Sequence, residues 1–201
     1  MVYYLCRMLG LRLPTDPRWV NIVESNLDEI LTDHAFCEQK AASNAITLIV
    51  NYPEYSDMVA RLVEIAREEL EHFAQVHELI IQRGQVLGRE RKDNYVNELM
   101  QFIKLPHRNR EEVLVDRLLF SAMIEARSCE RFRVLSENIK DEKLANFYRE
   151  LMISEAGHYT TFITFARQYA QEVDVDKRWQ EFLDYEAKVI ANYGKSETVH
   201  G

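Results

Sequence analysis

Two short stretches decide the fold: residues 68–73 read EELEHF, and residues 154–159 read SEAGHY. Each contains a glutamate followed three residues later by a histidine, and residues three apart lie on the same face of an α-helix. In both stretches this glutamate and histidine fall within a stripe of apolar residues at helical spacing. The pattern predicts two long helices that each direct a carboxylate and an imidazole toward the protein core.

Around these stretches, the same apolar spacing extends over four long segments. It predicts core helices at about 16–51, 56–83, 109–138 and 141–171, and a shorter helix at about 176–191. Few residues separate the first segment from the second, or the third from the fourth, so each pair is expected to be antiparallel neighbours. The connection between the second and third segments is long enough to cross a bundle. We therefore predict an all-α four-helix bundle with a crossover connection and extra short helices.

The composition agrees with one such domain over residues 1–201. The chain has only 6 Gly and 4 Pro among 201 residues, too few for a turn-rich β protein. No apolar run approaches the roughly 20 residues that a membrane-spanning helix needs. Arg7 and Arg12 interrupt the apolar N-terminal region, which lacks the core of a secretory signal. We expect a cytoplasmic protein with no membrane contact.

A glutamate lies in the middle of the apolar stripe of each long segment: these are Glu38, Glu69, Glu125 and Glu155. Glutamate is rarely fully buried unless it is paired or binds a metal. The spacing repeats, because Glu38 and Glu69 are 31 residues apart and Glu125 and Glu155 are 30 residues apart. The chain thus consists of two helix pairs, and each pair provides one Glu and one Glu-x-x-His.

Together these side chains match the ligand set of a carboxylate-bridged two-metal centre. Ferritin-like di-iron and di-manganese proteins use one Glu on each of two helices and Glu-x-x-His on the other two. Carboxylates bridge hard cations and imidazole suits iron, although manganese accepts the same ligands. The predicted metal ligands are Glu38, Glu69, His72, Glu125, Glu155 and His158. The alternative is buried glutamates paired with arginines, but Arg127 and Arg131 fall off the Glu125 stripe.

Residues beside the predicted ligands have less specific interpretations. Cys129 lies one turn after Glu125, and Tyr159 and Phe162 lie close to His158 in sequence. These three side chains could line a pocket, and ordinary core packing explains them as well. His34 precedes Glu38 by one turn and is either a partner of that glutamate or a core histidine. We assign no catalytic residue beyond the metal centre.

Charge alone argues against a nucleic-acid partner, because the net charge is −8 and phosphate contacts need clustered Lys and Arg. Basic residues nevertheless gather along and beside the long middle connection. The candidate nucleic-acid-binding residues are Arg83, Arg89, Arg91, Lys92, Lys104, Arg108 and Arg110. They could form one basic rim at one end of the bundle, or simply solvate the surface.

Further stretches are more distinctive than the ligand set: LPTDPRWV at 13–20, DHAFCEQKAA at 33–42 and MIEARSCERF at 123–132. With EELEHF and SEAGHY, they resemble the tRNA-(2-methylthio-N6-isopentenyladenosine) hydroxylases of the ferritin-like superfamily over nearly the whole chain. The resemblance implies a non-haem di-iron monooxygenase that hydroxylates the isopentenyl group of the modified adenosine at tRNA position 37. It also implies two Fe ions, O2 as co-substrate and an external electron donor, with Glu69 and Glu155 as the bridging ligands.

The expected partners are therefore the tRNA anticodon stem-loop and an electron-transfer protein such as a ferredoxin or reductase, and we expect a monomer. Other functions remain open for the same ligand set: a ferroxidase or iron-storage protein, a peroxidase, or a manganese catalase. Peroxidases coupled to a four-cysteine iron centre need paired CxxC motifs, and the three cysteines form none. A non-enzyme alternative is a metal-free helical interaction protein.

Overall fold

The computed structural model describes residues 9–103, 109–192 and 198–199. This part of the chain contains seven helices and no strand, which confirms the all-α prediction. The helices are α2 (Trp19–Ser25), α3 (Leu27–Asn51), α4 (Ser56–Gln82), α5 (Asn94–Gln101), α6 (Arg110–Asn138), α7 (Glu142–Tyr169) and α8 (Val175–Ile190). They fall into two compact units: residues 23–92 with 198–199, and residues 9–22, 93–103 and 109–192.

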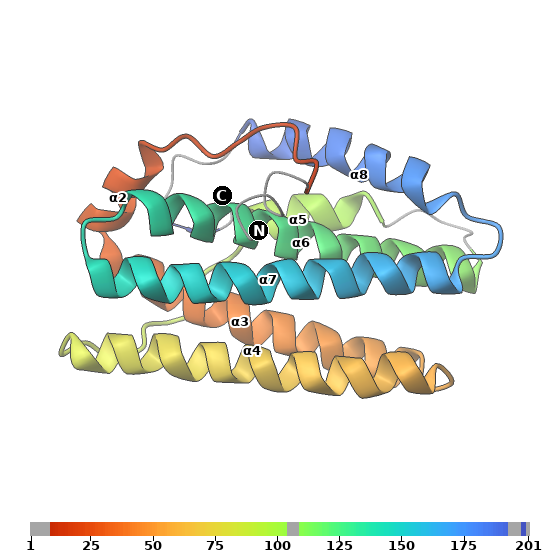
Figure 1. Ribbon diagram of the computed structural model, residues 1–201, viewed down its shortest axis with the longest axis horizontal. Coiled ribbons are helices and arrows are strands. Elements are labelled where there is room, and N and C mark those ends of the chain that lie inside the picture. Colours follow the sequence, from red (N-terminus) through yellow and green to blue (C-terminus); the bar gives the residue numbers. More distant parts are fainter. Residues whose placement is uncertain (1–8, 104–108, 193–197, 200–201) are drawn as a thin grey trace. The chain divides into compact units, whose positions relative to one another are not determined.

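The smaller unit is built on α3 and α4, which lie side by side and are joined by a short turn at 52–55 (Figure 1). Residues 30–35 at the start of α3 are all buried; beyond them, and along α4, the buried residues recur about every three or four positions, as in an amphipathic helix pair. On α4 the buried stripe includes Met58, Leu62, Ile65, Glu69, His72, Val76 and Ile80. The predicted stripe is thus the packed face of the helix.

The first predicted helix, 16–51, was wrong in one respect, because the structure divides it into α2 and α3 at Asn26. The backbone of Asn26 leaves the helical region, with φ −136° and ψ 37°. Ser25 and Asn26 are adjacent, and both residue types compete with helical hydrogen bonds through their own side chains. Asp28 and Glu29 then lie in the first turn of α3, where negative charge favours a helix start.

The larger unit is built around α6, which packs along α7 and also contacts α5 and α8 (Figure 1). Consequently α6 is buried on nearly all its faces. Asn109 caps this helix in a capping box with Glu112, and Asp141 caps α7. The helices α4, α6, α7 and α8 begin and end within about two residues of their predicted bounds.

The long middle connection contains the short helix α5, which packs on α8. Tyr95 and Leu99 are its buried residues, and just beyond it the Phe102 ring stacks on Tyr185 with centroids 4.6 Å apart. None of the helices described combines the length and apolar character needed to cross a membrane.

Candidate metal centre

The α3–α4 pair brings together the first three predicted ligands, Glu38, Glu69 and His72, and all three side chains are buried. His72 Nδ1 lies 3.2 Å from Glu69 Oε2 and 3.8 Å from Glu38 Oε2. One ligand atom of each residue lies within 4.8 Å of the others. The Glu-x-x-His spacing on α4 and the facing Glu on α3 therefore produce the convergence that the sequence predicted.

The carboxylate of Glu38 also contacts a second histidine on its own helix. His34 Nε2 lies 2.6 Å from Glu38 Oε1, and His34 is fully buried. Burial raises the pKa of Glu38, but the hydrogen bond with His34 and the nearby His72 outweigh burial and hold the pKa well below its usual range. Glu38 is therefore ionised, which is the form that binds a cation.

The α6–α7 pair provides the second set. Glu125 on α6 and Glu155 and His158 on α7 are buried, and one ligand atom of each lies within 4.8 Å of the others. This set repeats the composition of the first, with one Glu on one helix and Glu-x-x-His on its neighbour. The two helix pairs thus carry equivalent half-sets.

The chemistry of these half-sets fits a metal. Each offers two carboxylates and one imidazole, the hard oxygen and borderline nitrogen donors that iron and manganese accept. Burying an ionised carboxylate costs several kcal/mol unless an opposite charge compensates it. Two divalent cations would balance the four carboxylates, so the donor set and its charge both favour metal binding.

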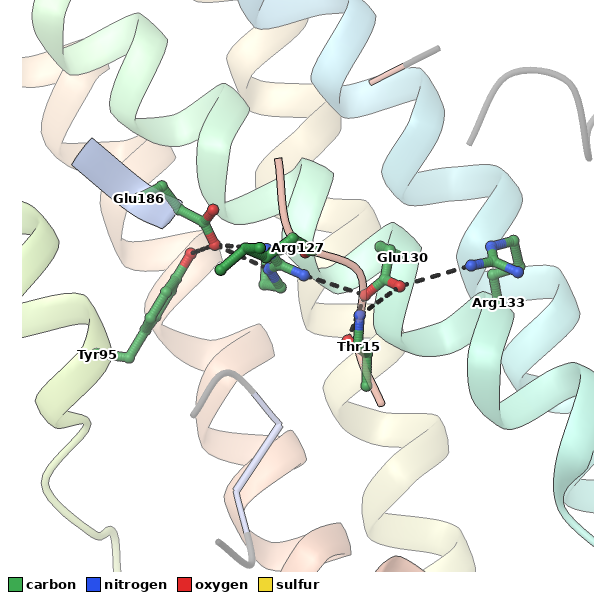
Figure 2. A network of polar contacts seen from close by, with 7 residues as sticks. Thr15, Tyr95, Arg127, Glu130, Arg133 and Glu186 are labelled. Atoms are coloured by element: carbon green, nitrogen blue, oxygen red, sulfur yellow. Dashed lines mark hydrogen bonds and ion pairs between the residues drawn. The ribbon is translucent and has the colours of Figure 1, made fainter. Parts of the chain in front are cut away.

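The buried Arg127 belongs to a polar network within the larger unit, away from the predicted ligands (Figure 2). Arg127 donates to Glu186 Oε1 at 2.7 and 2.9 Å and to Glu130 Oε2 at 3.2 Å. The Tyr95 hydroxyl donates to the same Glu186 oxygen at 3.2 Å. Arg127 therefore neutralises carboxylates other than the predicted metal ligands, as its position off the Glu125 stripe indicated.

The sequence patterns did not predict this network, although one of them indicated a buried carboxylate on α8. Glu186 interrupts the apolar stripe of α8, where its buried neighbours are Phe182, Leu183, Val189 and Ile190. That is the same signal that marked the predicted ligands. Burial raises the pKa of Glu186, while Arg127 and Tyr95 act in the opposite direction. An apolar stripe thus reveals a buried carboxylate but does not reveal whether its partner is a metal or an arginine.

The three predicted pocket-lining residues occupy different environments. Cys129 is fully buried, with its Sγ 3.4 Å from the backbone oxygen of Met152, and Phe162 is also buried. Tyr159 packs on Trp179 of α8, with ring centroids 5.8 Å apart. These contacts support core packing, most clearly for Tyr159, and a pocket-lining role stays a prediction.

The candidate tRNA-binding residues are described in part. Arg83, Arg89, Lys92 and Arg110 are exposed, whereas Lys104 and Arg108 lie outside the described residues. Arg91 contacts Glu29 twice at 3.3 Å, through the carboxylate and the backbone oxygen. Its charge is therefore partly neutralised. A single basic rim stays a prediction, because Arg110 belongs to the larger unit and the other four to the smaller one.

Buried Glu and Glu-x-x-His sets on paired helices define the ferritin-like class of all-α metal-binding proteins. Within that class, the chain belongs to the family described as tRNA-(MS[2]IO[6]A)-hydroxylase (MiaE), whose model matches residues 5–201. The match confirms the family resemblance seen in the sequence.

Two curated relatives carry the name tRNA 2-(methylsulfanyl)-N(6)-isopentenyladenosine(37) hydroxylase. The one from Pseudomonas putida is 39% identical over 163 residues, covering 81% of this chain and 77% of the relative. The one from Salmonella typhimurium is 28% identical, covering 94% of this chain and 87% of the relative.

A solved structure described as protein 43 with aldehyde deformylating oxygenase activity, from Synechococcus, is also similar. It is 31% identical with a TM-score of 0.86, and the match covers 95% of each chain. The agreement over nearly the whole chain confirms the predicted fold class.

Proposed function

We propose that this protein is a tRNA-modifying di-iron monooxygenase. It hydroxylates the isopentenyl side chain of 2-methylthio-N6-isopentenyladenosine at tRNA position 37, using O2 and two electrons. Family membership over residues 5–201 is the observation that carries this proposal. The names of the two curated relatives specify the same modified nucleoside.

The proposed centre holds two Fe ions with all six predicted ligands. The half-set of Glu38, Glu69 and His72 contributes one side, and the equivalent half-set on α6 and α7 contributes the other. When bound, the iron pair supplies the electrons that reduce dioxygen and the oxidising power that inserts oxygen into a C–H bond. The protein's own contribution is to hold the carboxylates and imidazoles in a buried environment, where electrostatic interactions are strong.

The proposed substrate is a single modified base of the tRNA anticodon loop. Loop bases can be splayed out of a single strand, so a prenylated adenosine can reach a buried site that a duplex base cannot. The exposed Arg83, Arg89, Lys92 and Arg110 are proposed to contact the phosphates. We further propose that the protein acts in the cytoplasm and receives its electrons from a ferredoxin or a flavin reductase.

The test is a reaction of the iron-loaded, reduced protein with an anticodon stem-loop that carries the prenylated nucleoside. The nucleosides are then separated and weighed by mass spectrometry. The proposal expects a product heavier by one oxygen atom, formed only in the presence of dioxygen and reductant. An unchanged nucleoside, with a protein shown to contain iron, would reject the hydroxylase function.

One observation favours a second candidate activity. The Synechococcus protein is described by its aldehyde deformylating oxygenase activity, and it shares the fold over 95% of each chain. The same preparation is therefore offered a long-chain aldehyde, and hydrocarbon and formate are measured. Turnover of the aldehyde without modification of the tRNA would show that the protein is an aldehyde deformylating oxygenase instead.

A further inference from the structure

His34 is a buried titratable residue that the proposed chemistry does not use, and its side chain contacts the proposed ligand Glu38. It lies one helical turn before Glu38 on α3, so both side chains lie on the same face of the helix. Its side chain is fully inaccessible to solvent, and that of Glu38 is nearly so. A histidine in this position either fills space in the core or orients the glutamate.

The geometry separates the two oxygens of the Glu38 carboxylate. His34 Nε2 lies 2.6 Å from Oε1, whereas His72 Nδ1 lies 3.8 Å from Oε2. The first distance is that of a short, charge-assisted hydrogen bond, and the second is not a hydrogen bond. One oxygen is thus held by α3 itself, while the other is directed toward Glu69 and His72 on α4.

The chemistry of the pair fixes the direction of this hydrogen bond. A carboxylate that coordinates a metal through one oxygen is ionised and only accepts at the other, so Nε2 of His34 would carry the hydrogen and donate it to Oε1. Such a hydrogen bond restricts the rotation of the carboxylate before any metal binds. Hydrogen-bonded partners of metal ligands characteristically orient them in this manner.

We propose that His34 is a positioning residue for the metal centre: its Nε2–H holds Oε1 of Glu38, so that Oε2 is presented as the metal-binding oxygen. The inference rests on the proposed function only for the presence of a metal. It assigns His34 a role that a core histidine would not have, namely control of metal affinity.

The test measures binding of iron(II) under anaerobic conditions, by equilibrium dialysis, in the absence of tRNA. Glutamine places its amide nitrogen close to the position of a histidine Nε2, whereas the shorter asparagine does not reach it. His34→Gln should therefore bind iron nearly as tightly as the wild type. His34→Asn and His34→Leu should bind roughly 10- to 100-fold more weakly, the usual loss when a hydrogen-bonded partner of a ligand is removed.

His77→Asn is the matched control, because His77 lies on α4 and stacks on Phe73 near the surface. It should leave iron binding unchanged. Circular dichroism of the metal-free proteins shows whether each variant folds. If His34→Leu does not fold, the comparison between His34→Gln and His34→Asn, which both carry a polar side chain, still tests the proposal.

Three results would overturn the proposal: wild-type affinity in His34→Asn, equal losses in the glutamine and asparagine variants, or no iron bound by the wild type. Failure of the proposed function is distinguishable from these results. A wild type that binds iron but leaves the tRNA nucleoside unchanged rejects the hydroxylase activity and leaves the role of His34 as measured.

Discussion

Glu69 shows how a single residue joins the fold to its proposed chemistry. It lies in the buried stripe of α4, where an apolar residue would be expected, and its Oε2 lies 3.2 Å from His72 Nδ1. Two positions further along the helix, Glu71 is exposed. The same residue type therefore occurs in two environments within one turn, and only the buried one is in a position to bind a metal.

Glu69→Gln should lower iron affinity by roughly 10-fold or more, because loss of a ligand costs at least as much as loss of an outer partner. Glu71→Gln is the control and should bind iron like the wild type. Elemental analysis after dialysis against a weak chelator measures both. Equal iron contents in the two variants would show that Glu69 is a structural carboxylate.

The burial and convergence of these side chains could be predicted from the sequence, because helical periodicity determines which residues share a face. That spacing places Glu69 and His72 on one face of α4, and the short connection between α3 and α4 predicts that Glu38 lies on the neighbouring helix. Glu186 could not be interpreted in the same way. Its partner Arg127 is 59 residues away in sequence, and periodicity carries no information about contacts between helices so far apart.

The helix α6 contains a buried network of polar contacts. Arg127 on α6 links Glu186 on α8 to Glu130 on α6, and it also donates to the backbone oxygen of Leu13 at 3.1 Å. Thr15 in turn donates its backbone N–H to Glu130 at 3.0 Å (Figure 2). The network therefore attaches the N-terminal segment and α8 to the central helix of the larger unit.

Arg127→Met should destabilise the protein by about 3–5 kcal/mol, because it leaves Glu186 buried without its cation. The double variant Arg127→Met/Glu186→Leu should recover much of that loss, since it removes both charges together. Urea denaturation measures the free energy of unfolding of each variant. Additive losses in the double variant would contradict this account.

Arg167→Met provides the control at the surface. Arg167 pairs with Asp176 at 2.7 Å, but more than half of each side chain is exposed. An exposed ion pair contributes about 0–1 kcal/mol, so this substitution should have little effect on stability.

Element boundaries were predictable where capping residues marked them. Asn109 and Asp141 lie directly before α6 and α7, and the predicted starts differ from the observed ones by one residue. The break at Asn26 was not anticipated, because no proline or glycine marks it. Adjacent Ser25 and Asn26 were a weaker signal, and apolar spacing continued across them.

At the scale of the whole molecule, an acidic chain must bind a substrate that is itself a polyanion. The net charge is −8, and the exposed basic residues of the smaller unit include Arg89 and Lys92 at the end of its sequence range. Contacts with phosphate need only a local excess of cations, because screening limits longer-range repulsion to about 8–10 Å at physiological salt. A monomer with a local basic surface stays a prediction.

Charge reversal at Arg89→Glu with Lys92→Glu should weaken binding of the anticodon stem-loop and reduce the slope of its salt dependence by roughly one for each lost contact. Lys177→Glu on α8 is the matched control, since Lys177 is exposed but is not one of the predicted contacts. Fluorescence anisotropy over a range of salt concentrations measures both quantities. Identical salt slopes in the two variants would reject Arg89 and Lys92 as phosphate contacts.

The number of iron ions bound per chain tests the central claim most directly. The protein is loaded with iron(II) without oxygen, freed of unbound metal, and assayed for iron and protein in the same sample. The account predicts two irons per chain, because two half-sets with two carboxylates and one imidazole each suit two divalent cations. A chain that binds no iron would contradict it.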